Sequence, residues 1–262
     1  YEMLRSLVGS EMCIRDRSYR LQDLMEGIDD IVIRILDLFC GAGGAAEGYD
    51  QALTELGIDH EIVGVDIAPQ PRYPFRFVQG DALEYLAQHG HEFDFIHASP
   101  PCQAYTQLKY MFKNDPSYAE RHPALIPDVR RMLIKIGVPY VIENVMGAIE
   151  ELNAPIVLCG YVLGLQVYRH RAFECDPFVL APPHLKHPEK CPSAGRGKSK
   201  RHGIISVTGT GGSPNLGMPY LDYARRAMGI DWMNRAELSE AIPPAYTRWI
   251  GMQIFSTVER VK

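Results

Sequence analysis

Short apolar runs alternate with stretches of helical character along the first half of the chain. Runs of this length, bounded by glycine, proline or aspartate, are typical of strands buried on both faces of a sheet. Predicted strands cover residues 31–39, 60–65, 75–78, 93–98 and 140–142. Because helical patterns lie between them, the alternation predicts an α/β fold with a doubly wound, Rossmann-like parallel sheet.

A small insertion is predicted in the second half of the chain. Proline, glycine and basic residues crowd into residues 176–218, where Ile204–Thr208 is one strand-like run. Residues 219–262 regain helical patterning and are expected to return to the main domain of residues 31–175. Residues 1–17 resemble translated sequencing-adapter read-through, so they are left out of the fold prediction.

Composition narrows the class of protein. The 262 residues are 46% hydrophobic, and no apolar run approaches the roughly 20 residues that span a bilayer, so we expect a soluble protein without a membrane partner. Six scattered cysteines without a CxxC pair indicate a reducing, cytoplasmic setting. The net charge of −5 does not suggest nucleic-acid binding, but it can hide a basic patch. The inserted region holds such a group: Lys186, Lys190, Arg196, Lys198, Lys200 and Arg201.

Ligand-binding chemistry is expected where the predicted strands end. Gly41–Gly44 form a glycine loop after the first strand, Asp66 ends the second, and Asp81 follows the third. Glycines allow backbone N–H groups to approach a ligand, and an acid after the next strand can accept ribose hydroxyls. Turn glycines and helix-capping aspartates are the ordinary alternative for each position. Three such features at successive strand ends favour a nucleoside ligand.

A candidate nucleophile and a candidate acid follow later strands. Cys102 comes directly after two prolines at the exit of residues 93–98, where open α/β sheets carry their chemistry. Glu143 follows a very apolar strand, so burial should raise its pKa and let it hold a proton. A free cysteine is more often a small buried hydrophobe, which is the interpretation preferred for Cys40 in the glycine loop.

Two further groups are weaker signals. Arg169 and Arg171 are predicted to share one face of an extended segment and to suit an anionic or carbonyl-bearing ligand; a solvated edge strand with a salt bridge to Glu174 is the alternative. A second group can offer metal ligands, but its H-x2-H-x3-C spacing fits no strong zinc pattern, so no metal site is predicted. It comprises His184, His187, Cys191 and His202.

Taken together, the motifs resemble those of the DNA cytosine-5 methyltransferases, in the compact form of phage-like members. The resemblance covers nearly everything from Ile33 to Ile254. The segments that carry it are Asp37–Gly44, Pro101–Gln103, Glu143–Val145, Arg169–Arg171, Met228–Met233 and Glu240–Tyr246. It departs from the family pattern at Val167, where the family usually has glutamine, and at Ser239–Glu240, which replaces a Gly-Asn pair.

The resemblance implies a class I S-adenosylmethionine-dependent methyltransferase with a small target-recognition region at residues 176–218. Its substrate would be double-stranded DNA, in a restriction–modification or phage setting, and the chain would act as a monomer. The implied catalytic residues are Cys102 as nucleophile, Glu143 as the acid at cytosine N3, and Arg169 and Arg171 on the base or its phosphate. The implied S-adenosylmethionine contacts are Phe39, Gly41, Gly43, Pro101, Asp66 on the ribose, Ile67 on the adenine and Asp81 on its amino group.

Three alternatives remain at this point. An RNA cytosine-5 methyltransferase acting on tRNA would use the same chemistry. A non-catalytic, cofactor-binding DNA-binding protein would not need both Cys102 and Glu143. A cysteine hydrolase would require a histidine base, and His97 is predicted to point into the sheet.

Overall fold

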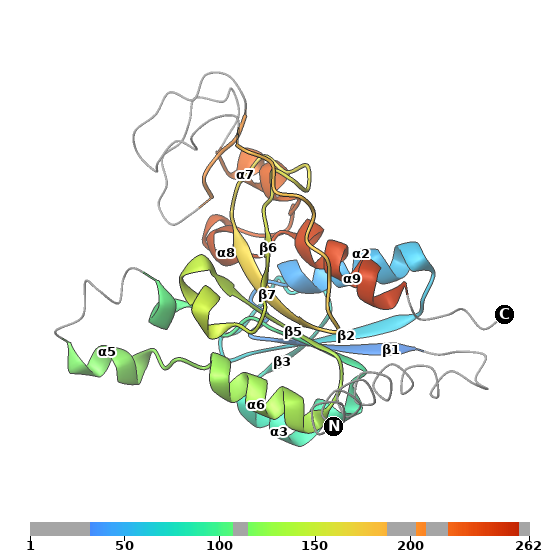
Figure 1. Ribbon diagram of the computed structural model, residues 1–262, viewed down its shortest axis with the longest axis vertical. Helices are drawn as coiled ribbons and strands as arrows, with labels where there is room; N and C mark the ends of the chain where they lie inside the picture. The colour runs from blue at the N-terminus through green and yellow to red at the C-terminus, as the bar shows by residue number, and fades with distance from the viewer. Residues whose placement is uncertain (1–31, 107–114, 188–202, 208–219, 257–262) are drawn as a thin grey trace, which may run out of the picture.

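A seven-stranded sheet forms the centre of the described part of the chain (Figure 1). The computed structural model describes residues 32–106, 115–187, 203–207 and 220–256. The strands are β1 (Ile33–Leu38), β2 (His60–Asp66), β3 (Arg76–Gln79), β4 (Phe95–Ala98), β5 (Tyr140–Val145), β6 (Ile156–Leu158) and β7 (Arg171–Asp176), in the order β3-β2-β1-β4-β5-β7-β6.

Strands β1 to β5 are parallel, whereas β7 runs antiparallel to both β5 and β6. The carboxyl ends of the parallel strands therefore meet at one edge of the sheet. The amino end of β7 lies at that same edge, because Arg171 pairs with Val145. Loops from widely separated parts of the sequence converge at this edge. Ligands of open α/β sheets bind at such an edge, so a functional site is expected here.

Helices cover both faces of the sheet (Figure 1). One face packs against α2 (Gly44–Leu56) and α9 (Pro244–Phe255), and the other against α3 (Ala82–His89) and α6 (Ile126–Ile136). Each face has its own apolar core, as expected for strands that are hydrophobic on both sides. The remaining helices are η1 (Gly90–Glu92), η2 (Gln103–Tyr105), α5 (Pro116–Arg121), η3 (Met146–Glu151), α7 (Tyr220–Met228) and α8 (Arg235–Glu240).

Helix α9 packs directly against α2, at the start of which the glycine loop ends. A Cβ on Gly48 would lie 2.1 Å from the carbonyl oxygen of Pro244, so only glycine permits this close crossing. Thr247 donates from its hydroxyl to the carbonyl oxygen of Ala45 at 2.8 Å. The C-terminal segment thereby buttresses the loop that follows β1.

The five predicted strands are confirmed, with boundary shifts of one or two residues at most positions. The predicted helix at residues 45–56 is also confirmed, and Gly57 ends it with a positive φ of 66°. The helix predicted after Asp81 begins at Ala82, with Asp81 as its cap. Residues 1–17 and most of the basic insertion lie outside the described residues, and the proposed domain boundaries remain predictions.

Three local predictions were wrong. Strand β5 continues through Glu143 to Val145, because pairing with β7 extends it. Arg169 and Arg171 do not share a strand face, since β7 begins at Arg171 and Arg169 has a φ of 26°. Within the described part of the run predicted at 204–208, Ile205 makes only an isolated bridge to Val167.

The part of the chain that the structure describes contains no helix with both the length and the apolar character needed to cross a membrane.

Candidate active site

The glycine loop after β1 is held open by its backbone conformation. Gly41 and Gly43 have φ values of 48° and 86°, which favour glycine. A Cβ on Gly43 would lie 2.6 Å from Cδ of Pro74, whereas a Cβ on Gly41 would meet nothing within 4 Å. Gly43 also caps α2 without any side-chain acceptor. The loop therefore offers open space over the Gly41 backbone, close to a helix N-terminus and beside Phe39, which also has a positive φ.

Asp66 and Ile67 lie across from this loop at the end of β2. Asp66 accepts hydrogen bonds from the backbone N–H groups of Gly41 at 3.0 Å and Ala68 at 2.9 Å, so it fixes the distance between the two loops. The side chain of Ile67 is 73% exposed, which is unusual for isoleucine. An exposed apolar side chain next to a carboxylate suits a ligand that combines a flat ring with hydroxyl groups.

Asp81 has the capping role that ordinary helix chemistry predicts. Its Oδ1 accepts from the backbone N–H groups of Leu83 and Glu84 at 2.8 and 2.9 Å. The side chain is exposed at the same edge of the sheet as Asp66. The capping interaction occupies one carboxylate oxygen and orients the other, so capping and ligand binding are compatible.

Cys102 lies in the loop after β4, and β5 holds that loop in place. Asn144 donates from its side-chain amide to the carbonyl oxygen of Pro100 at 2.8 Å, next to Pro101. The Cys102 side chain is half-buried and precedes η2. Burial raises the pKa of its thiol, while the positive charge of Arg171 lowers it. The thiol therefore lies within electrostatic reach of a guanidinium that stabilises its thiolate.

Glu143 faces the same place from within β5. Its residue is only 5% exposed, and Nε of Arg171 lies 3.1 Å from its Oε1, although that oxygen has no hydrogen-bond partner of good geometry. Burial raises the pKa of Glu143, an effect that Arg171 and a hydrogen bond from Ser99 partly offset. The predicted direction of the pKa shift is confirmed. A carboxyl group in this environment can hold and donate a proton.

Arg169 and Arg171 have different partners. Arg171 pairs with Glu143, whereas Arg169 donates to the carbonyl oxygens of Val207 and Ser239, each at 2.7 Å. Burial, followed by repulsion from Arg171, lowers the pKa of Arg169 to about 9, so it remains a cation at neutral pH. Arg169 thus fastens the loops around the site, while its Nε has no hydrogen-bond partner. The alternative pairing with Glu174 is wrong, because Glu174 binds Arg130.

His97 is excluded as a general base. It is fully buried, with Nδ1 3.0 Å from the Tyr49 hydroxyl and Nε2 2.9 Å from Oγ of Ser99. Burial lowers its pKa to about 3, so the ring is neutral. Cys40 is also excluded as the nucleophile, since burial and the nearby Asp37 raise the pKa of its thiol.

A cavity of about 510 Å³ opens beside the arginines. It lies between the ends of β5 and β7 and the segment 203–207, next to the loop that carries Cys102. Its lining includes Tyr105, Thr106, Met146, Arg169, Arg171 and Ser206. A cavity of this size with two cationic side chains can accommodate a polar, nucleobase-sized group.

Sequence reasoning missed two polar residues that shape the site. Asp37 is buried in β1, accepts from the Tyr73 hydroxyl at 3.2 Å, and its Oδ1 has no partner. Asn144 connects the Cys102 loop to β5. Asp37 could have been singled out from the sequence as an acid inside an otherwise apolar strand. The partner of Asn144 cannot be predicted from its neighbours in the sequence.

Comparisons with known proteins relate part of the sequence, and the fold, to methyltransferases. No family model matches the chain. A segment of 124 residues is 32% identical to a protein named Type II methyltransferase M.HgiCI from Herpetosiphon aurantiacus, and it covers 44% of this chain but only 28% of that protein. The solved structure of the methyltransferase EhMeth of Entamoeba histolytica superposes with a TM-score of 0.55 at 14% identity, covering 88% of this chain and 100% of EhMeth.

The fold is that of the class I S-adenosylmethionine-dependent methyltransferases, as the sequence predicted. The partial sequence match independently relates the chain to the methyltransferases. The chain spans less than a third of the length of that relative, so its particular reaction and substrate are matters for proposal.

Proposed function

We propose that this chain is a DNA (cytosine-5-)-methyltransferase, which transfers a methyl group to C5 of a flipped cytosine through a covalent Cys102 adduct. The observation that carries the proposal is the convergence of three side chains, from the loop after β4, from β5 and from β7. The Cys102 thiol, the buried Glu143 carboxyl and the Arg171 guanidinium meet at one edge of the sheet, with Arg171 acting electrostatically on both others.

The residues around the glycine loop fit S-adenosylmethionine. The space over Gly41 is open, Ile67 offers an exposed apolar surface to the adenine, and Asp66 and Asp81 stand at neighbouring strand ends to accept hydrogen bonds. When bound, S-adenosylmethionine supplies an electrophilic methyl group. Phe39, Gly43 and Pro101 complete the proposed contacts.

The chain's own groups make cytosine reactive. Cytosine C5 is a poor nucleophile until the Cys102 thiolate adds to C6; the C5–C6 double bond then becomes single, and an enamine forms between C5 and C4. Glu143 delivers its proton to N3, so that negative charge does not build up on the ring. Arg171 stabilises the thiolate before addition. C5 then takes up the methyl group that S-adenosylmethionine would supply, and S-adenosylhomocysteine leaves with the electrons of the broken sulfur–carbon bond. A base removes the C5 proton, the C5–C6 double bond forms again as the C6–sulfur bond breaks, N3 returns its proton to Glu143, and Cys102 is released as the thiolate.

The proposed substrate is cytosine in double-stranded DNA. These steps need access to both faces of the ring, so the base must leave the helical stack. The cavity beside Arg169 and Arg171 has room for such a base. The name of the partial relative, a Type II methyltransferase, supports a methyl-transfer role in a restriction–modification setting.

Bisulfite sequencing of DNA from a host that expresses the chain tests the proposal directly. We expect 5-methylcytosine at a defined sequence, and none in a host that expresses Cys102→Ser. Bisulfite sequencing of RNA from the same cells separates the tRNA alternative. Methylation confined to RNA, or absent from both nucleic acids with folded protein present, would contradict the proposal.

Covalent trapping tests the mechanism. DNA that contains 5-fluorocytosine should accumulate a protein adduct, because fluorine at C5 blocks the final proton removal. Peptide mapping should place the adduct on Cys102. An adduct on Cys40 would overturn the assignment of the nucleophile.

A further inference from the structure

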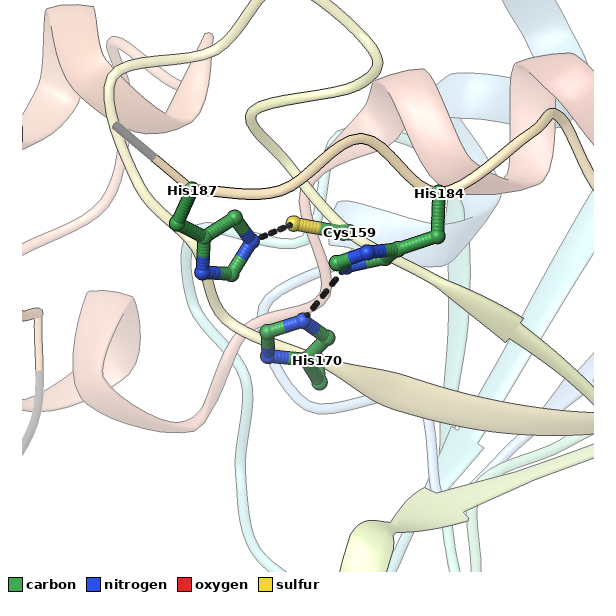
Figure 2. Close-up of side chains that lie close together, drawn as sticks. All are labelled: Cys159, His170, His184 and His187. Atoms are coloured by element: carbon green, nitrogen blue, oxygen red, sulfur yellow. Dashed lines mark hydrogen bonds between the residues drawn. The ribbon is translucent and has the colours of Figure 1, made fainter. Parts of the chain in front are cut away.

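Four potential metal ligands converge outside the proposed active site. Cys159, His170, His184 and His187 each offer one ligand atom, and these atoms all lie within 4.8 Å of one another. Figure 2 shows the four side chains pointing toward a common centre. Sγ of Cys159 lies 3.2 Å from Nε2 of His187, and Nε2 of His170 lies 3.0 Å from Nε2 of His184.

The geometry points to a zinc site formed by these four side chains, and we propose it as such. Bond lengths of about 2.3 Å to sulfur and 2.0–2.1 Å to nitrogen place the ligand atoms of a tetrahedral zinc with one sulfur roughly 3.3–3.6 Å apart. The two closest contacts here, 3.2 and 3.0 Å, are slightly shorter, and all four ligand atoms lie within 4.8 Å of one another. One thiolate and three imidazoles are ligands that zinc prefers over magnesium or calcium. Four protein ligands leave no open position, so the site is structural rather than catalytic.

The surroundings of the cluster suit a bound metal. The ring of His187 stacks on Tyr168 with centroids 3.7 Å apart and planes 3° from parallel, which fixes the direction of its nitrogens. Cys159 is only 1% exposed and packs with Tyr168 and Ile204, whereas His184 is exposed. An apolar inner wall with one open side protects the ion and still allows it to enter.

The proposed ion would join three segments that are distant in the sequence. Cys159 directly follows β6, and His170 directly precedes β7. His184 and His187 lie at the start of the basic insertion, where the carbonyl oxygen of Leu180 also accepts from the indole of Trp249 in α9 at 2.8 Å. The zinc would therefore fix the insertion to the β6–β7 connection. Its ligand His170 lies between Arg169 and Arg171 in the sequence.

This site differs from the sequence interpretation in two of its four members. His184 and His187 are retained, but Cys159 and His170 take the places of Cys191 and His202, which lie outside the described residues. The metal site rests on its own geometry and stands independently of the proposed methyltransferase reaction.

Metal analysis of the purified full-length chain tests the site. After dialysis against metal-free buffer and titration with zinc chloride, elemental analysis should find about one zinc per chain. Cys159→Ser and His187→Ala should each weaken zinc affinity by at least about 10–100-fold, since even lost outer hydrogen bonds typically cost that much. Cys175→Ser and His89→Ala are matched controls that should keep full zinc content.

Cobalt substitution tests the ligand set. Cobalt(II) in place of zinc should give the visible bands of a tetrahedral site and a thiolate-to-cobalt charge-transfer band, and Cys159→Ser should lose the latter. Circular dichroism establishes that each variant is folded, and the exposed His184→Ala serves where Cys159→Ser does not fold. A wild-type chain without stoichiometric zinc would overturn the proposal. So would zinc lost in Cys191→Ser or His202→Ala but retained in Cys159→Ser.

Discussion

The two halves of the sheet hold their polar groups in different ways. Around β1 to β3, the carboxylates of Asp66 and Asp81 are bound by backbone N–H groups of their own or neighbouring loops, and no ion pair is recorded for either among the described residues. Around β4 to β7, the buried Glu143 carboxyl lies 3.1 Å from Nε of the half-buried Arg171 on the neighbouring strand. The carboxylates of the first half are positioned to accept hydrogen bonds from a ligand. The second half instead holds an ionisable pair where little water can reach it.

This contrast has an energetic consequence. A carboxylate bound by backbone donors near solvent serves as a fixed acceptor. A carboxyl that is buried beside a guanidinium has a raised pKa and can exchange a proton, at a cost to stability. Substitutions in the two halves should therefore have separable effects on binding and on chemistry.

The largest effect is expected at Cys102. Cys102→Ser should reduce methyl transfer to the enzyme-free background, because a serine hydroxyl is far less nucleophilic than a thiolate toward C6. Affinity for S-adenosylmethionine, measured by calorimetry, should not change. Cys175→Ser is the matched control and should retain full activity; equal loss in both variants would show that the thiol acts through folding.

Glu143→Gln should reduce kcat by about 10²–10⁴-fold, the usual contribution of a positioned acid. Glutamine keeps the shape and size of the side chain but cannot transfer a proton. Tritium release or methyl incorporation under saturating substrate measures the effect. An unchanged kcat would remove Glu143 from the chemistry and leave it as a partner of Arg171.

The pH profile of the same variant provides an independent check. Burial raises the pKa values of both Glu143 and Cys102, and the reaction needs the acid protonated and the thiol deprotonated. In the wild type, the gain in thiolate with pH is offset once pH passes the pKa of Glu143, so kcat/KM should reach a plateau there. In Glu143→Gln, kcat/KM should continue to rise up to the pKa of Cys102. Parallel profiles would contradict the assigned roles.

Asp66→Ala should affect binding rather than chemistry. Removal of one hydrogen-bonding carboxylate should weaken S-adenosylmethionine affinity by about 1–3 kcal/mol, the usual cost of unpaired polar groups. The kcat at saturating cofactor should change little, which would separate this half of the sheet from the other. Calorimetry that shows unchanged affinity would exclude Asp66 from the cofactor site.

The same contrast explains how far the sequence could be interpreted. Asp66, Asp81 and the glycine loop depend on local rules for strands, turns and caps, and those rules placed them at the correct edge of the sheet. Arg169 depends on Val207 and Ser239, which lie 38 and 70 residues away, so its turned backbone could not be read from an alternating pattern.

The proposed metal ligands show the same limit. Cys159 and His187 are 28 residues apart in the sequence, yet Sγ of Cys159 lies 3.2 Å from Nε2 of His187. The pairing of Leu158 in β6 with Arg171 in β7 brings Cys159 beside His170, and the chain returns after the end of β7 to bring His187 there. Spacing rules for metal sites favour ligands that are close in sequence. They therefore point to Cys191, which is close to His187, and not to Cys159.

The smallest effect is expected from substitutions in the basic insertion. These should act on DNA binding, whereas Asp66→Ala should act on cofactor binding. Lys198→Ala combined with Lys200→Ala should weaken DNA binding and reduce the slope of log affinity against log salt by roughly 2, because each lost phosphate contact removes about 1. Cofactor affinity should not change. Lys135→Ala, on the exposed face of α6, is the control and should leave the slope unchanged. If the double variant keeps both its DNA affinity and its salt slope, the insertion does not hold the phosphate backbone, and DNA must contact another surface next to the Cys102 loop.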